Sequence, residues 1–155
     1  LEQKLPIERI VVMVQKEVAE RMTARPGSKI YGALSVSVQY YTEPEILFEI
    51  PPRAFMPAPE VTSAVVTMDV RKQPPVTVLE EKRFFQVVKA AFSQRRKTFS
   101  NTLKGAGVSK DDIQQILAAS GIDGSRRGET FSLDEFAAVS DAWTRLIQKQ
   151  DVSCQ

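Results

Sequence analysis

The 155-residue chain carries 21 Lys and Arg against 19 Asp and Glu, and this near balance does not by itself indicate a nucleic-acid-binding protein. The chain contains no histidine and a single cysteine, Cys154, so its composition argues against a metalloenzyme, histidine acid–base catalysis and an internal disulfide. No apolar run approaches the roughly 20 residues that span a bilayer, and with 43% hydrophobic residues we expect a folded cytoplasmic protein.

The first part of the chain has the pattern of an α/β sheet. A β-branched run at 10–14 predicts a strand buried on both faces, and residues 16–24 follow with apolar positions at helical spacing. Residues 31–43 fit either a strand or a helix, and we favour the helix. Further strands are predicted at 45–50 and 63–70, on either side of a proline-rich turn that reverses the chain.

The periodicity changes at the stretch RKQPPVT, where two prolines and polar neighbours disfavour both helix and sheet interior. Ser109 stands where the N-cap of a predicted helix is expected, with Asp111 and Asp112 in its first turn. Ser132 and Glu135 have the spacing of a capping box. The sequence therefore predicts the end of an α/β sheet in residues 1–72 and a small helical domain in residues 73–155. Amphipathic patterns predict the helices of the second part at 79–94, 97–105, 109–120 and 132–150.

The loop before the last predicted strand is stiff. Four prolines between residues 51 and 59 fix much of its backbone, so the loop can present Phe55 in one direction at modest entropic cost. A rigid exposed aromatic side chain is a stacking surface for a nucleotide base. The alternative is that Phe55 packs into the core beneath the loop.

Basic residues gather in three places that the overall charge conceals. The largest cluster lies where the helix predicted to end near Gln94 meets the next helix, so its cations could spread along a phosphate backbone. The alternative is a solvated helix end whose cations interact with the helix dipole. The sequence predicts RNA contacts at all three clusters, which are Arg95, Arg96 and Lys97, then Arg126 and Arg127, and finally Arg71 and Lys72.

Four segments carry a resemblance to a known family: IVVMVQKEVAERM, YGALSVSVQYY, FMPAPEVTSAVV and AAFSQRRKTFSNTL. In this order they resemble the second half of the bacterial ribosomal RNA small-subunit adenine dimethyltransferases, which are related to the erythromycin-resistance methyltransferases. The resemblance implies a Rossmann-like methyltransferase domain followed by a small helical domain. It implies S-adenosylmethionine-dependent dimethylation of two adjacent adenines near the 3′ end of small-subunit ribosomal RNA, a step of ribosome biogenesis. It also implies that Phe55 faces the target adenine.

Two family motifs are missing from this sequence. It has neither the glycine-rich loop that binds S-adenosylmethionine nor the Asn-Pro motif that holds the target amine, and its one Gly-x-Gly, at 105–107, follows a predicted helix. We therefore expect a fragment of such an enzyme that is inactive alone, with no catalytic, cofactor-binding or metal-binding residues of its own. The expected partners are small-subunit ribosomal RNA and the immature small subunit, with no membrane, and unpaired sheet edges favour self-association.

Two other functions remain open. The chain could be a non-catalytic ribosome-binding or RNA-binding module, or its helical part could be a protein-interaction domain whose arginines pair with acidic partners. Binding to RNA through several phosphates should weaken steeply as salt rises, and this dependence separates the alternatives.

Overall fold

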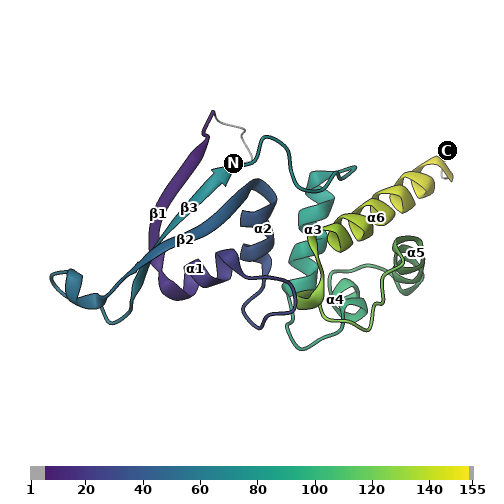
Figure 1. Cartoon of the computed structure of the whole chain (residues 1–155). Helices are drawn as coiled ribbons and strands as arrows, with labels where there is room; N and C mark the ends of the chain where they lie inside the picture. Colours follow the sequence, from purple (N-terminus) through teal and green to yellow (C-terminus); the bar gives the residue numbers. More distant parts are fainter. Residues whose placement is uncertain (1–5, 154–155) are drawn as a thin grey trace. The chain divides into compact units, whose positions relative to one another are not determined.

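The computed structural model describes residues 6–153, so Cys154 lies outside the described residues (Figure 1). The chain divides into two compact units. The sheet unit comprises the residues up to Arg25 together with Ile30–Pro75, and the helical unit comprises Pro26–Lys29 together with the residues from Val76 onward. The class predicted from the sequence, α/β followed by helices, is confirmed. The assignment of residues 1–72 to the end of a methyltransferase domain and of residues 73–155 to a small helical RNA-facing domain stays a prediction.

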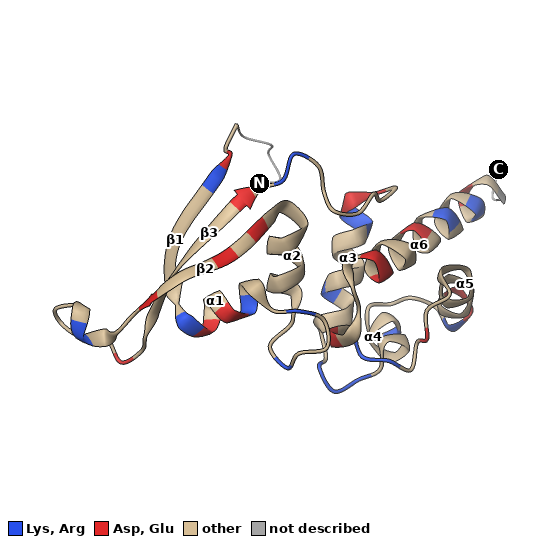
Figure 2. Cartoon of the chain, in the orientation of Figure 1, with Lys and Arg blue, Asp and Glu red and all other residues tan. Residues whose placement is uncertain are grey.

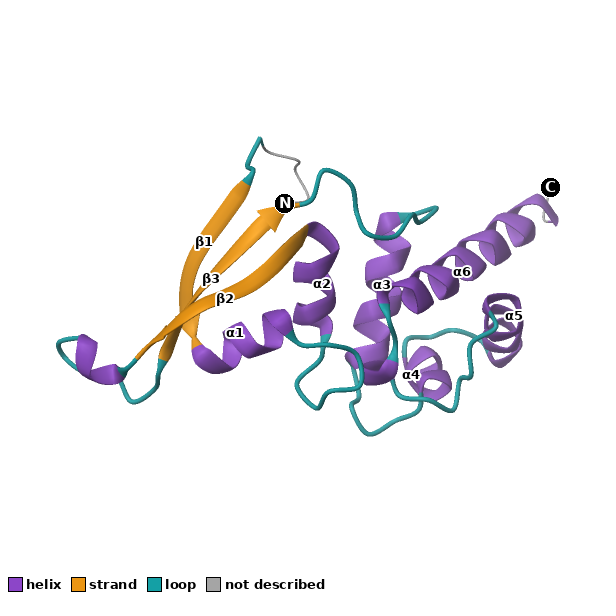
Figure 3. Ribbon diagram, viewed as in Figure 1, coloured by secondary structure: helices purple, strands orange, loops and turns teal. Residues whose placement is uncertain are grey.

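The sheet unit is built on three antiparallel strands, with β3 between β1 and β2 (Figure 3). Alternate apolar side chains of β3, Ala64, Val66 and Met68, are buried against Ala19 and Met22 of the first helix. The helix favoured over residues 31–43 is confirmed as α2. The elements of this unit are β1 (Arg9–Gln15), α1 (Lys16–Thr23), α2 (Ala33–Tyr41), β2 (Thr42–Ile50), the 3-10 turn η1 (Pro52–Ala54) and β3 (Ser63–Val70).

The first strand does not have two buried faces, and that prediction is wrong for the residues described. Ile10, Val12 and Val14 pack against the core, whereas Val11 and Met13 on the other face are 58% and 54% exposed. The reason is that the core cluster with α1 covers one face of the strand, and nothing in residues 6–153 covers the other to the same degree. A run of β-branched residues shows that a strand forms, not what lies over each face.

The helical unit packs its aromatic residues into one core. Phe84, Phe99, Phe131 and Phe136 are each fully buried, and neighbouring rings meet edge to face or tilted at centroid distances of 4.8 to 6.5 Å. All four predicted helices are confirmed, and most of them span fewer residues than the sequence pattern indicated. They are α3 (Glu81–Phe92), α4 (Phe99–Gly105), α5 (Lys110–Ser120) and α6 (Leu133–Ser153), with the 3-10 turn η2 (Gly128–Thr130) before α6.

The predicted caps also form. The Ser109 hydroxyl accepts a hydrogen bond from the Asp112 amide at 3.1 Å, and α5 ends at Gly121, whose φ of 69° is the left-handed conformation that glycine adopts without strain. Ser132 and Glu135 bond each other's backbone amides at 3.2 and 2.9 Å, which completes the capping box of α6. Within residues 6–153 no helix combines the length and the apolar composition needed to cross a membrane.

Candidate nucleic-acid interface

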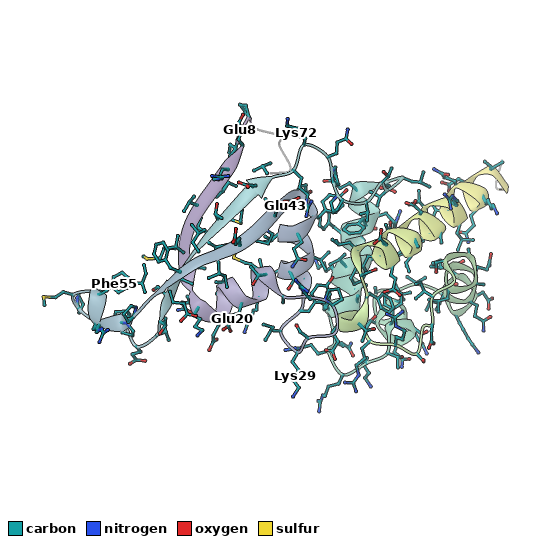
Figure 4. The ribbon with its side chains drawn as sticks, viewed as in Figure 1. Glu8, Glu20, Lys29, Glu43, Phe55 and Lys72 are labelled. Carbon is teal, nitrogen blue, oxygen red and sulfur yellow. The ribbon has the colours of Figure 1, made fainter. Side chains whose placement is uncertain are left out.

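Phe55 lies in the loop that joins β2 to β3, at the end of the sheet (Figure 4). The last paired residues before the loop are Ile50 and Ser63. The loop begins with η1, in which the Ala54 amide donates to the Pro51 carbonyl at 3.0 Å and the Phe55 amide donates to the Pro52 carbonyl at 3.1 Å. These bonds and the prolines hold the backbone that carries Phe55 in one conformation.

The Phe55 ring is partly exposed and is not one of the buried core residues. Its neighbour Met56 is 99% exposed. Among the described residues, Phe55 stacks on no other aromatic ring. Phe55 is therefore neither fully buried in the core nor fully exposed, and its stacking on a base stays a prediction.

Arg71 is tied to its own unit. Its Nε donates to the carbonyls of Gln39 and Thr42 at 3.1 and 3.2 Å, and its Nη1 pairs with Glu43 at 2.6 Å. These bonds hold the end of α2 against the start of β2, and they leave Arg71 few donors for a phosphate. Lys72 beside it is exposed, and Figure 4 labels it. This cluster belongs to the sheet unit, whereas the other two belong to the helical unit.

Arg126 also has a structural partner. It forms two bonds with the Glu135 carboxylate, at 2.5 and 3.1 Å, and its guanidinium lies 4.6 Å from the centre of the Phe131 ring. The hydrogen bond from Arg126 lowers the pKa of the Glu135 carboxyl below its ordinary value, and the Ser132 amide acts in the same direction. Arg126 thus fastens the loop before η2 to the first turn of α6, whereas its neighbour Arg127 is exposed.

Five basic residues of the helical unit lie on neighbouring loops and form what we call the basic edge: Lys29, Arg95, Arg96, Lys97 and Arg127. All five are exposed, and none forms an ion pair with a carboxylate of the described residues. Figure 2 shows blue segments on the loops that carry them, and Figure 4 shows the Lys29 side chain directed away from the ribbon. The edge is therefore a group of solvated cations that no internal carboxylate neutralises.

Backbone hydrogen bonds explain why these loops are neighbours. The Phe99 amide donates to the Arg126 carbonyl at 2.8 Å, which places the 123–127 loop against the start of α4. The Gly27 amide donates to the Glu129 carbonyl at 2.7 Å, and Arg95 donates to the carbonyl of Lys29. Lys29 was missed from the sequence because it stands alone there, and only these contacts bring it beside the arginines.

The described residues do not fit a nucleotide-type cofactor. Binding of such a group at the end of a strand uses a glycine-rich turn before the following helix. Here β1 passes directly from Gln15 into α1 at Lys16, and the glycines with positive φ, Gly27, Gly107 and Gly121, do not follow a strand. Within residues 6–153 no group of three metal-ligating side chains is found either.

Residues 1–141 match the family described as ribosomal RNA adenine dimethylase. The chain is 57% identical over 143 residues to ribosomal RNA small subunit methyltransferase A of Desulfitobacterium hafniense, covering 92% of this chain and 51% of that protein. It is 50% identical over 153 residues to the protein of the same name from Geobacillus kaustophilus, covering 96% and 52%. The chain therefore spans about half the length of these curated relatives.

Two solved structures resemble the fold. A dimethyladenosine transferase from Plasmodium falciparum superposes with a TM-score of 0.74 at 20% identity, over 89% of this chain and 58% of that one. The 23S rRNA methyltransferase ErmE superposes with a TM-score of 0.62, also at 20% identity, over 91% and 57%. At this identity the two structures show that the fold is shared.

Proposed function

Because the chain belongs to the family of ribosomal RNA adenine dimethylases, we propose that it is the RNA-holding part of an enzyme that dimethylates adenines of small-subunit ribosomal RNA. The longer enzyme would use S-adenosylmethionine, bound by residues outside this chain, and would act on two adjacent adenines near the 3′ end of the RNA in the immature small subunit. The observation that carries the proposal is the 57% identity over 92% of the chain to a protein named for this substrate.

The loop of Phe55 would hold the base. A partly exposed ring on a proline-stiffened loop costs little entropy to order on binding, and it offers a face to an adenine taken out of its stack. Stacking of a base on an aromatic side chain contributes about 1–3 kcal/mol and does not depend on the sequence around it. Phe55 would thus orient the adenine ring while other residues of the enzyme act on its amine.

The basic edge would hold the phosphate backbone. Its cations form no ion pair with a carboxylate of residues 6–153, so binding a phosphate would not require breaking such a pair. Arginine and lysine side chains bound to phosphates release counterions from the RNA, and this makes the affinity fall as salt rises. Contacts of this kind position the RNA without reading its bases.

The test is the salt dependence of binding between this chain and a hairpin with the sequence of the 3′ end of small-subunit ribosomal RNA. Replacing Arg95, Arg96 and Lys97 together by glutamine should weaken binding and lower the slope of log affinity against log salt by about 0.7 to 0.9 for each phosphate that the protein no longer binds. The matched control replaces Lys82, Lys110 and Arg145, which are exposed on α3, α5 and α6, and changes the net charge equally.

Circular dichroism provides the folding control for both triple variants. Equal salt slopes for the wild type and the basic-edge variant would refute phosphate binding at this edge. Equal losses in both triple variants would mean that only net charge matters, and this would equally refute a specific site. Such a result would leave the solvated helix end as the explanation of the cluster.

A non-catalytic RNA-binding module is the second candidate. The observation in its favour is that residues 6–153 offer no glycine-rich turn after a strand. The two candidates predict different activities for the longer protein of which this chain would be a part. Methyl transfer to the hairpin by that longer protein supports the enzyme, whereas tight RNA binding without transfer supports the module.

A further inference from the structure

Arg53 is a basic residue of the loop that carries Phe55, and it has no partner among the described residues. Three others, Arg9, Lys16 and Arg71, each form an ion pair with a carboxylate on a strand of the sheet. Arg53 is exposed and forms no hydrogen bond or ion pair with the described residues. Its guanidinium is therefore free to bind an anion without giving up an internal contact.

The position of Arg53 is fixed relative to Phe55. Arg53 is the middle residue of η1, and the bond from the Phe55 amide to the Pro52 carbonyl closes the turn around it. Arg53 and Phe55 are two positions apart in the sequence, so their Cα atoms are separated by at most about 7 Å. The side chain of Arg53 can therefore reach a group bound beside the Phe55 ring. Pro51 and Pro52 directly precede Arg53 and restrict the backbone at the start of the turn.

The charges near the loop favour an anion at Arg53. The loop holds one other charged residue, Glu60, with which Arg53 forms no ion pair. At the base of the loop, Lys16 and Glu49 pair with each other at 2.9 Å and so contribute little net charge. A guanidinium presents paired N–H donors that match a phosphate, which is the anionic group carried by every nucleotide of an RNA.

We propose that Arg53 binds the phosphate adjacent to the adenine that stacks on Phe55, so that one turn of the chain holds both the base and the backbone of a single nucleotide. This inference rests on the proposed function, since it places an adenine at Phe55. The ligand is a single-stranded adenosine nucleotide within RNA. The contact would fix the rotation of the adenine about its backbone, which stacking alone leaves free.

The test uses this chain and a short single-stranded RNA in which 2-aminopurine replaces the adenine, so that stacking quenches its fluorescence. Arg53→Gln should lower the affinity about tenfold, the loss expected for a hydrogen bond between charged groups, and should reduce the salt slope by about 0.7. Arg53→Lys should restore the salt slope but not the full affinity, because it keeps the charge without the paired donors. The matched control is Arg21→Gln, an exposed arginine of α1 without an ion pair among the described residues.

A second RNA carries neutral methylphosphonates on both sides of the 2-aminopurine. With this RNA, the wild type and Arg53→Gln should bind equally, because the group that Arg53 recognises is no longer charged. A tenfold difference that persists with the neutral RNA would overturn the assignment to these phosphates. An Arg53→Gln affinity equal to that of Arg21→Gln would overturn it as well.

Phe55→Ala separates this inference from the proposed function. Quenching that is unchanged in Phe55→Ala would contradict the proposed stacking of adenine on Phe55, and with it the pairing of base and phosphate contacts. Quenching that depends on Phe55 while Arg53→Gln has no effect would contradict the Arg53 inference alone and leave the proposed function standing. Circular dichroism of each variant confirms that the sheet unit is folded.

Discussion

Replacing Arg126 by glutamine should destabilise the helical unit, although the sequence shows Arg126 only as one member of an arginine pair. The change removes two hydrogen bonds to Glu135, at 2.5 and 3.1 Å, one to the Thr130 carbonyl at 2.9 Å, and the contact with the Phe131 ring. Glutamine cannot replace a planar cation that meets a carboxylate with two donors.

The expected size of the destabilisation follows from the exposure of the pair. The side chains of Arg126 and Glu135 are 32% and 29% exposed, so we take the lower end of the range for hydrogen bonds between charged groups, about 1.5 kcal/mol. The cation–π contact with Phe131 adds about 1 kcal/mol. A total of about 2.5 kcal/mol corresponds to a fall in melting temperature of about 10–20 °C for a unit of this size.

Thermal and urea unfolding followed by circular dichroism measure this destabilisation. The matched control is Arg127→Gln, which removes the same charge from the next residue, where the side chain is exposed and unpaired. We expect it to change the free energy of unfolding by less than about 0.5 kcal/mol while it lowers the affinity for RNA. Equal stability of the two variants would refute a structural role for Arg126.

Three further predictions follow from the same structure. Folding lowers the pKa of Glu135, so the wild type should have a larger free energy of unfolding than Glu135→Gln above the ordinary carboxyl pKa of 4.5. This difference should be lost as the pH falls through the lower pKa of the folded state, and urea unfolding across that pH range measures it. Gly128→Ala should destabilise the helical unit by about 1–3 kcal/mol, since its Cβ would lie 2.8 Å from the backbone oxygen of Ala91, whereas Gly105→Ala, with 3.7 Å to its nearest neighbour, should be neutral or stabilising in the same unfolding assay. This chain alone should show no saturable binding of S-adenosylmethionine by calorimetry, and tight binding would mean that the chain holds a cofactor site without a glycine-rich turn after a strand.

Most of the secondary structure could be predicted because the periodicity of apolar residues and the capping residues indicated the same elements. Apart from Val65, residues 63–70 alternate polar and apolar side chains, and β3 has these bounds. The caps of α5 and α6 form where Ser109, Ser132 and Glu135 predicted them. Residues 31–43 were ambiguous because their apolar residues suit both periods. Burial of the adjacent residues Ser35 and Val36 together with Tyr40 fits one face of a helix and not the alternation of a strand.

The site could be predicted only in part. A sequence gives the identity of a charged residue but not its partner, so Arg126 and Arg127 look alike although only the first is held by Glu135. The same holds for Arg71, whose bonds reach back to residues of α2 and β2 that are 28 to 32 positions earlier. Lys29 and Arg53 carry no signal in the sequence, because what distinguishes them is their contacts and their lack of a carboxylate partner.

We propose that this chain holds the substrate of a ribosomal RNA adenine dimethyltransferase, and the single-turnover rate of methyl transfer tests this proposal. The measurement compares the full-length enzyme with its Phe55→Ala variant on small-subunit ribosomal RNA, with Val61→Ala in the same loop as the control. We predict that Phe55→Ala slows transfer about 5- to 150-fold, which corresponds to removing about 1–3 kcal/mol of stacking, while affinity for the cofactor is unchanged. An unchanged rate in Phe55→Ala, or a decrease no larger than that of Val61→Ala, would contradict the proposal that this chain holds the substrate adenine.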